Sequence, residues 1–306
     1  MAGVSAAEFR ALYERCRGTV PADGALRGAL DRITPDTVVA AAREVRAGVH
    51  VSLEAPVETT SGPDNPEPAV HRMTGGVASD TGGGGLDFAR DRIGMNVHGD
   101  AYSHLDALCH VIYDGTLFGG VDAATVTAAG AQALSVALAR DGIVGRGVLL
   151  DIPRLRDSPW LEPGDQVTAD ELAAAEEAQD VRVGAGDLLF VRVGHRARRT
   201  RLGAWNAAEA RAGLHPYAME FVAERQVAVL GSDGNNDAAP STTEGVAFPV
   251  HVLAIHAMGI HLLDYLRFED LVPVCEEQGR WSFFCVIAPL RFPAATGSPV
   301  NPIAVL

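Results

Sequence analysis

The sequence predicts an α/β protein, because short apolar strands alternate with helices along most of its 306 residues. The clearest strands are Gly147-Val-Leu-Leu-Asp151 and Asp187-Leu-Leu-Phe-Val-Arg-Val193, since short apolar runs of this kind are typical of buried strands. Two helix starts are equally clear. Thr34 stands as an N-cap before Pro35, and Thr168-Ala-Asp-Glu171 has the pattern of a capping box.

The remaining elements are assigned from periodicity and composition, in chain order. Helices are expected at 5–17, 35–46, 123–140, 168–179 and 217–224, and strands at 49–53, 86–97, 147–151, 187–193, 227–230, 281–290 and 291–293. The segment 59–85 is rich in Gly, Pro, Ser, Thr and Asp, so it is expected to be a flexible loop or flap. No internal repeat or linker is evident. Residues 1–306 are therefore expected to form a single domain, in which 1–58 is an N-terminal extension of helix and strand.

Charge and hydropathy exclude two classes of partner. The formal net charge is −14, and no basic stripe is present to neutralise phosphates, so a nucleic-acid partner is not expected. Only 196–201 is locally basic, and it is interpreted as a solvated loop or helix end rather than an anion site. No apolar run reaches the roughly 18 residues that a membrane-spanning helix needs, so no membrane association is expected either.

Two residue types narrow the chemistry and the compartment. All 25 positively charged side chains are arginine, which excludes Schiff-base formation, pyridoxal phosphate anchoring and a P-loop lysine. The four cysteines are scattered, form no C-x-x-C pair and follow no signal peptide, so a reducing cytoplasm is the expected location. Cys109 lies within the histidine-rich segment and is interpreted as a small buried residue.

The densest group of metal-capable side chains lies between residues 98 and 110, and consists of His98, Asp100, His104, Asp106 and His110. Imidazole nitrogen and carboxylate oxygen together suit zinc, manganese or iron, and such a site can lower the pKa of a bound water to about 7. His104 and Asp106 share one face of an extended segment, because side chains alternate along a strand. The segment therefore predicts a site for a divalent metal that activates water.

A second histidine-rich stretch follows an Asp-rich loop. Pro249-x-His251 follows that loop, and His251 is predicted to be functional. His256 and His261 lie in an apolar, helix-like run, so they are predicted to be buried packing residues. Asp233 and Asp237 in the loop are predicted to cap it after a strand and to orient the metal ligands.

The motif His104-x-Asp106-x-x-x-His110 resembles the signature of the metal-dependent cyclase family, which includes bacterial kynurenine formamidase and isatin hydrolase: His-x-Gly-Thr-His-x-Asp-x-Pro-x-His. Five further stretches are similar to that family in the same order: Asp114–Gly120, Gly145–Asp151, Gly186–Arg192, Gly231–Asp233 and Gly297–Pro302. The resemblance covers most of the chain from about residue 86 onward. It implies a swivelling β/β/α fold with a mixed central sheet or barrel and surrounding helices.

The resemblance also implies roles for individual residues. His104 and Asp106 match metal ligands of the family, and His110 matches a ligand or general base. The later histidine and carboxylate of the family fall on His251 and Asp264, with His256 as the competing histidine. His110 and His251 are accordingly expected to be the catalytic groups, because imidazole titrates near neutral pH.

The front of the motif departs from the family. The first histidine of the signature is replaced by Asp100, and His98 lies two residues further upstream, so either side chain is a candidate for that ligand position. Ser103 replaces a threonine and Leu108 a proline. The expected cofactor is a divalent ion, manganese or zinc, with one or two ions bound.

The expected function is that of a metal-dependent hydrolase, in which metal-activated water opens an amide, lactam or lactone carbonyl bond of a small, including aromatic, substrate. One alternative is a metal-dependent cyclase, dehydratase or lyase acting on a polyketide-like intermediate. Another is a family member that binds a ligand without turnover. The resemblance further implies a homo-oligomer, a dimer or a tetramer.

Overall fold

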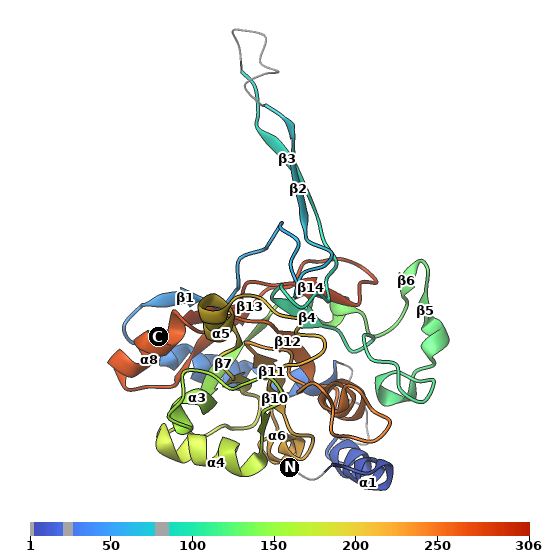
Figure 1. Cartoon of the computed structure of the whole chain (residues 1–306), viewed down its shortest axis with the longest axis vertical. Helices are drawn as coiled ribbons and strands as arrows, with labels where there is room; N and C mark the ends of the chain where they lie inside the picture. Colours follow the sequence, from blue (N-terminus) through green and yellow to red (C-terminus); the bar gives the residue numbers. More distant parts are fainter. Residues whose placement is uncertain (1–2, 21–26, 77–85) are drawn as a thin grey trace.

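The computed structural model describes residues 3–20, 27–76 and 86–306. Within these residues, nine strands form one curled sheet in the order β1-β15-β13-β7-β9-β11-β12-β4-β14 (Figure 1). Their bounds are β1 His50–Ser52, β15 Ile303–Val305, β13 Ser282–Ile287, β7 Ile143–Asp151, β9 Leu188–Arg192, β11 Val229–Ser232, β12 His261–Asp264, β4 His104–Asp106 and β14 Gly297–Pro299. The predicted α/β class with a mixed central sheet is confirmed.

The centre of the sheet is parallel and its two flanks are antiparallel. Strands β7, β9, β11 and β12 run in the same direction, and apolar side chains cover both of their faces. In β9, for example, Leu189 packs in one core cluster and Phe190 in the other. Alternate side chains of a strand point to opposite faces, which explains why the strand sequences are continuously apolar.

The flank formed by β4 positions the histidine-rich segment. Strand β4 pairs antiparallel with β12, so that His104 lies opposite Asp264, and pairs on its other side with β14, so that Asp106 lies opposite Gly297. This register brings together carboxylates and imidazoles that are about 160 residues apart in the chain.

Helices cover the sheet and its ends. The α-helices among the described residues are α1 Ala6–Arg17, α2 Pro35–Ala41, α3 Ile152–Leu155, α4 Ala169–Ala178, α5 His195–Leu202, α6 Ala218–Glu224, α7 Pro249–His251 and α8 Leu271–Gln278. Shorter helical turns are η1 Gly28–Arg32, η2 Ala42–Glu44, η3 Phe118–Gly120, η4 Ala123–Thr125, η5 Val136–Ala139 and the π-helical η6 Val252–Ala257. The caps predicted at Thr34 and Thr168 are confirmed, because each side chain accepts a hydrogen bond from the backbone N–H three residues on. None of the helices described here is long and apolar enough to cross a membrane.

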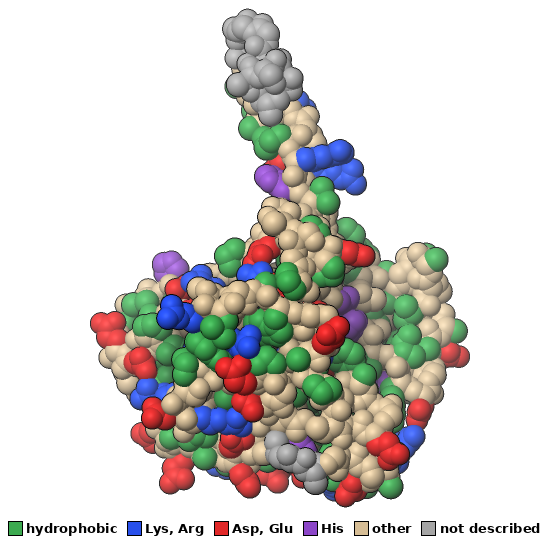
Figure 2. Space-filling view, viewed as in Figure 1, with side chains coloured by type: hydrophobic (Ala, Val, Ile, Leu, Met, Phe, Trp, Pro, Cys, Tyr) green, Lys and Arg blue, Asp and Glu red, His purple; other side chains and the backbone are tan. Residues whose placement is uncertain are grey.

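A two-stranded arm, β2 Val70–Gly75 and β3 Arg90–Gly94, projects from the body (Figures 1 and 2). The segment 59–85, expected to be a flexible loop or flap, contains the strand β2, and its part at 77–85 lies outside the described residues. The strand predicted at 86–97 is shorter and belongs to this arm rather than leading into the histidine-rich segment. Exposed apolar side chains lie along the arm, but the expected homo-oligomer stays a prediction.

The helix predicted at 123–140 is wrong. The segment contains η4, the short strands β5 Val126–Thr127 and β6 Gly130–Ala131, and η5. Its backbone turns through the left-handed region at Gly130 (φ 108°) and Leu134 (φ 56°), which a helix cannot accommodate. The N–H groups of Ala131 and Val136 bond instead to the carbonyl oxygens of Ala294 and Ala295. The richness in Ala and Leu favours a helix locally, but tertiary pairing overrides that preference.

Three smaller expectations also need correction. The Arg-rich stretch holds a helix, α5, and Arg196 within it is buried rather than solvated. His261 begins β12 and does not lie in a helical run. Residues 291–293 form no strand, and the terminal strands are instead β14 and β15.

The packing of β7 against β13 generates a stability prediction. A Cβ atom added at Gly147 would overlap the ring of Phe283, whereas one at Gly145 would stand 3.6 Å from Leu188 Cγ, an ordinary contact. The ring of Phe283 also stacks on Phe190, which limits its freedom to move. We expect Gly147→Ala to lower the free energy of unfolding by about 1–3 kcal/mol and Gly145→Ala to change it by less than about 0.5 kcal/mol. Urea denaturation of both variants measures this, and equal effects would contradict the packing described.

Candidate metal centre

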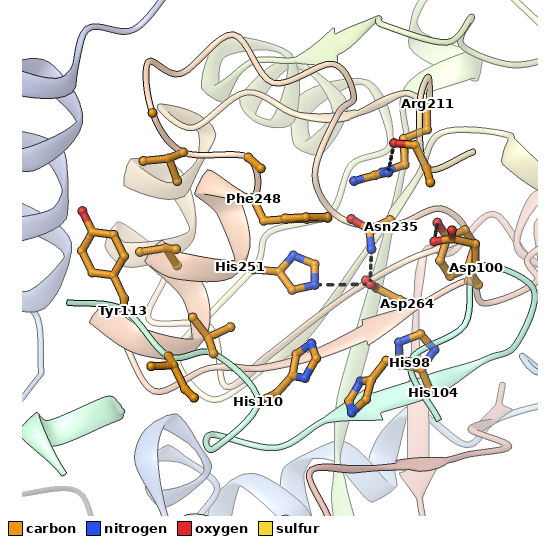
Figure 3. Close-up of a pocket in the computed structure, with 18 residues that line it drawn as sticks. His98, Asp100, His104, His110, Tyr113, Arg211, Asn235, Phe248, His251 and Asp264 are labelled. Carbon is orange, nitrogen blue, oxygen red and sulfur yellow. Dashed lines mark hydrogen bonds and ion pairs between the residues drawn. The ribbon is translucent and has the colours of Figure 1, made fainter. Parts of the chain in front are cut away.

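A pocket of about 600 Å³ opens where β11, β12 and β4 lie side by side (Figure 3). Its polar wall is formed by His98, Asp100, His104, His110, Arg211, Asn235, His251 and Asp264. Its apolar wall is formed by Val111, Ile112, Tyr113, Val246, Phe248 and Val252. Ligands commonly bind beyond the carboxyl ends of parallel strands, and the loop after β11 and the end of β12 supply part of this pocket.

Strand β4 presents His104 and Asp106 on one face, as their spacing predicts. His104 Nδ1 donates a hydrogen bond to the carbonyl oxygen of Tyr102 at 2.8 Å, which leaves Nε2 free of a proton in the neutral ring. That Nε2 faces Asp106 Oδ1 at 3.6 Å. Both side chains are buried, so the sheet holds a carboxylate and an imidazole nitrogen side by side away from bulk water.

Of the two candidates for the first ligand position of the motif, His98 lies beside Asp106 and Asp100 does not. His98 Nδ1 lies 2.8 Å from Asp106 Oδ1, its Nε2 lies 2.9 Å from Thr296 Oγ1, and its ring stacks on that of His110 with centroids 3.8 Å apart. Asp100 instead accepts a hydrogen bond from the hydroxyl of Tyr265 at 2.7 Å. Asp100 lines the pocket without joining either group of potential ligands.

His251 enters the cluster from α7 and is oriented by Asp237. The carboxylate of Asp237 accepts hydrogen bonds from the backbone N–H groups of Val250 and His251 and from His251 Nδ1, the last at 2.6 Å. The other ring nitrogen, Nε2, then points inward, 3.4 Å from Asp106 Oδ2 and 3.5 Å from Asp264 Oδ2. The orienting role predicted for Asp237 agrees with this arrangement, which is typical of histidines that hold metals.

Asp264 is held by two asparagines that sequence reasoning missed. Its carboxylate accepts hydrogen bonds from the side-chain amides of Asn235 at 2.8 Å and Asn236 at 2.5 Å, and from the backbone N–H of Asn236. Both asparagines lie in the Asp-rich loop after β11, and their adjacency there was the available signal. The next residue, Tyr265, has a left-handed backbone (φ 56°) that turns the chain at the pocket.

Two groups of potential ligand atoms meet at Asp106. The first is His98, His104 and Asp106, the second is Asp106, His110 and His251, and within each group the ligand atoms lie within 4.8 Å of one another. Asp106 Oδ2 is buried and has no hydrogen-bond partner among the described residues. A buried carboxylate oxygen without a donor is rare in a folded protein, so this atom calls for a cation. The nitrogen and oxygen donors around it suit a divalent transition metal.

The cluster perturbs the pKa values of its members. Burial alone would raise the pKa of Asp106, but His110 and the contacts with His251 and His98 lower it well below the ordinary value. Burial lowers the pKa of His110 to about 4, so its ring is neutral at pH 7. Burial would also lower the pKa of His251, but Asp106, Asp237 and Asp264 raise it well above 6.5. A divalent cation would replace the charge that the proton on His251 provides.

The other residues singled out in the sequence lie outside the cluster. His256 is bonded to the hydroxyl of Tyr13 and to Thr116, and His261 is buried in β12, as expected of packing residues. Asp233 accepts hydrogen bonds from the backbone N–H groups of Val193 and Gly194, just after β9, and forms no hydrogen bond with the potential ligands. Burial raises the pKa of the Cys109 thiol to about 11, which agrees with a packing role.

Comparison with known proteins places the chain in a family. The family model described as putative cyclase matches residues 35–236. A crystal structure described as that of a novel cyclase is 30% identical, with a TM-score of 0.81, and the match covers 93% of this chain and 95% of that one. No curated protein matches the chain.

Two further solved structures share the fold. Isatin hydrolase A from Ralstonia solanacearum is 23% identical with a TM-score of 0.60, over 89% of this chain and 97% of that one. A predicted metal-dependent hydrolase from Bacillus stearothermophilus is 18% identical with a TM-score of 0.52, over 84% of this chain and 97% of that one. Because the family model spans more than half of the sequence, and the sheet and helices match those of its solved members, the chain belongs to the cyclase family.

Proposed function

We propose that this protein is a metal-dependent hydrolase that opens an amide, lactam or lactone carbonyl bond of a small substrate. The observation that carries the proposal is the buried, unpartnered Oδ2 of Asp106 among imidazoles at the wall of the pocket. A catalytic metal site needs protein donors on one side and an open position on the other. The cluster supplies the donors, and the pocket supplies the open side.

The donors of this chain fit one or two ions of manganese or zinc. With one ion bound, His98, His104 and Asp106 would be its ligands, and His110 and His251 would remain free for proton transfer. A second ion would bind at Asp106, His110 and His251. Asp264 faces His251 Nε2 and would complete the oxygen donors. A bound ion would polarise the substrate carbonyl and lower the pKa of water.

His110 and His251 are the groups we assign to proton transfer. His110 lines the pocket, and burial keeps its ring neutral at pH 7, so it can accept a proton from water that attacks the carbonyl. The same ring would return that proton to the leaving nitrogen or oxygen. Asp237 holds His251 with Nε2 directed at Asp106 and Asp264, which fixes the geometry of the second imidazole.

The names of similar structures support hydrolysis without deciding the bond. Isatin hydrolase acts on a cyclic amide, as its name indicates, and that protein shares this fold. The relative at 30% identity is described as a cyclase, so a cyclase, dehydratase or lyase acting on a polyketide-like intermediate is the second candidate. Release of a free carboxylic acid from isatin, N-formylkynurenine or simple lactones would favour hydrolysis, and proton exchange without such release would favour the second candidate.

Loss of the metal should abolish turnover. We expect wild-type protein purified without chelator to contain a divalent ion by plasma mass spectrometry, and chelation to remove activity that manganese or zinc restores. His104→Ala and Asp106→Ala should lose metal and activity together, because each removes a donor from the cluster. The matched control is His71→Ala, since His71 lies on the exposed arm and pairs with Asp91. Full metal content and activity in either cluster variant would contradict the assigned centre.

Substitution of His110 should separate proton transfer from metal binding. We expect His110→Gln to lower kcat by about 10²–10⁴ while more of the metal is retained than in His104→Ala. Glutamine keeps a polar side chain of similar reach but cannot accept and return the proton. Steady-state kinetics together with metal analysis measures the two effects. A fall in kcat that only mirrors the fall in metal content would make His110 a ligand and not a base.

Two buried aspartates of the same loop give a matched pair. Asp237 and Asp233 each accept two backbone N–H groups, but only Asp237 also holds a histidine of the cluster. We expect Asp237→Asn to weaken metal affinity or activity by about 10–100-fold, because an amide cannot accept all three hydrogen bonds. Asp233→Asn should leave metal affinity unchanged. Titration against a competing chelator measures both, and equal affinities would contradict the orienting role.

A further inference from the structure

Arg211 is a buried guanidinium at the wall of the pocket. Its side chain is among the largest fully buried ones, with 2% of its surface exposed. Nε donates to the carbonyl oxygen of Asp237 at 3.0 Å, and Nη1 donates to the carbonyl oxygens of Ala207 at 2.9 Å and Ala208 at 3.3 Å. The remaining nitrogen, Nη2, has no hydrogen-bond partner in the part of the chain that the structure describes.

The charge of Arg211 is not neutralised within the described residues. Among the described residues, Arg196 is the other buried arginine and it too bonds to carbonyl oxygens, but it does not line this pocket. No carboxylate among the same residues forms an ion pair with Arg211. Backbone carbonyls satisfy its donors but carry no net charge. A buried charge without a counter-charge is costly, and a guanidinium does not lose its proton in a protein. An anion in the pocket would supply the missing charge.

The position of Arg211 suits the far end of a bound substrate. Figure 3 shows Arg211 and Phe248 on one side of the pocket, and His98, His104 and His110 on the other. The Phe248 ring lies against the guanidinium, with Cζ 5.2 Å from the ring centroid. Phe248 and the other apolar side chains of the wall, including Tyr113, are suited to an aromatic or aliphatic body.

The arginine is also held rigidly with respect to the cluster. Backbone hydrogen bonds join Arg211 and Ala239 in both directions, at 3.0 and 2.9 Å. The carbonyl oxygen of Asp237 accepts a hydrogen bond from Arg211 Nε, and the carboxylate of Asp237 accepts one from His251 Nδ1. One residue therefore sets the distance between the guanidinium and an imidazole of the centre, and a substrate held at Arg211 would be held in register with the reacting groups.

We propose that Arg211 binds a carboxylate of the substrate, so that the substrates are monoanionic acids whose apolar body lies against Phe248 and whose scissile carbonyl lies at the metal centre. The proposal rests on the hydrolytic function proposed above. The guanidinium of Arg211 carries one positive charge and has one nitrogen, Nη2, free to donate, so it suits one negatively charged carboxylate. A dianionic phosphate would be left with uncompensated charge beside Asp100 and Asp264, which line the same pocket.

The test compares formanilide with its ortho-, meta- and para-carboxylate derivatives as substrates of the metal-loaded enzyme. We expect at least one carboxylate to have a KM about tenfold or more below that of formanilide, because hydrogen bonds to charged groups contribute this much. In Arg211→Gln the ratio of the two KM values should collapse towards one. Arg17→Gln removes an exposed positive charge outside the pocket and should keep the wild-type ratio. Equal KM values in the wild type, or an unchanged ratio in Arg211→Gln, would overturn the proposal.

Two further measurements keep the test decisive. If Arg211→Gln does not fold, the kinetic test of this variant is replaced by a crystal structure of the wild-type holoenzyme with the carboxylate that has the lowest KM. A carboxylate at hydrogen-bond distance from Nη2 supports the proposal, and a carboxylate on the metal centre with Nη2 unoccupied overturns it. If neither these compounds nor isatin, N-formylkynurenine and the simple lactones are hydrolysed, the hydrolytic function fails. The affinities of the carboxylates and of formanilide, measured by calorimetry, then test the proposed subsite at Arg211 alone. Equal affinities for the acids and for formanilide would overturn that subsite.

Discussion

The buried carboxylate of Asp106 is the group on which the arrangement of the site depends. A charged oxygen without a hydrogen bond is costly inside a protein, and here Oδ2 has no hydrogen-bond partner among the described residues and lies 3.4 Å from His251 Nε2. The imidazoles that surround it come from the segment before β4, from β4 itself, from the segment after β4 and from α7. The pairing of β4 with β12 sets Asp264 beside them. One charge requirement therefore accounts for the convergence of several distant segments.

Around this carboxylate, a set of hydrogen bonds fixes the directions of the side chains. The carbonyl oxygen of Tyr102 sets the proton position on His104, and the carboxylate of Asp237 sets it on His251. The amides of Asn235 and Asn236 hold Asp264. These partners leave Nε2 of His104 and Nε2 of His251 directed at Asp106, an orientation typical of histidines that hold metals. Asp237 further connects the cluster to Arg211, so that the chemistry and the proposed recognition of a carboxylate share one support.

Individual helices and strands show which parts of the fold can be predicted from neighbouring residues in the sequence. The strands of the parallel centre and the caps at Thr34 and Thr168 are predicted correctly, because apolar runs and capping hydrogen bonds depend on neighbouring residues. The helix predicted at 123–140 is wrong because the N–H groups of Ala131 and Val136 bond to Ala294 and Ala295, far along the chain. Strand β3 lies within the strand predicted at 86–97, but β2 is not predicted, because its side chains are exposed and no alternation of buried residues marks it as a strand.

The sequence by itself predicted the metal chemistry that we propose for this protein: the spacing of His104, Asp106 and His110 indicates a metal site, because alternate residues of a strand share a face. It also indicated the family, the α/β class and the second histidine, His251. Only the tertiary structure decided between His98 and Asp100, since that choice depends on a loop that stacks His98 on His110. Arg211 and the asparagines likewise gain their roles from contacts across 20 residues or more. Such contacts are set by sheet register and burial, which no local pattern encodes.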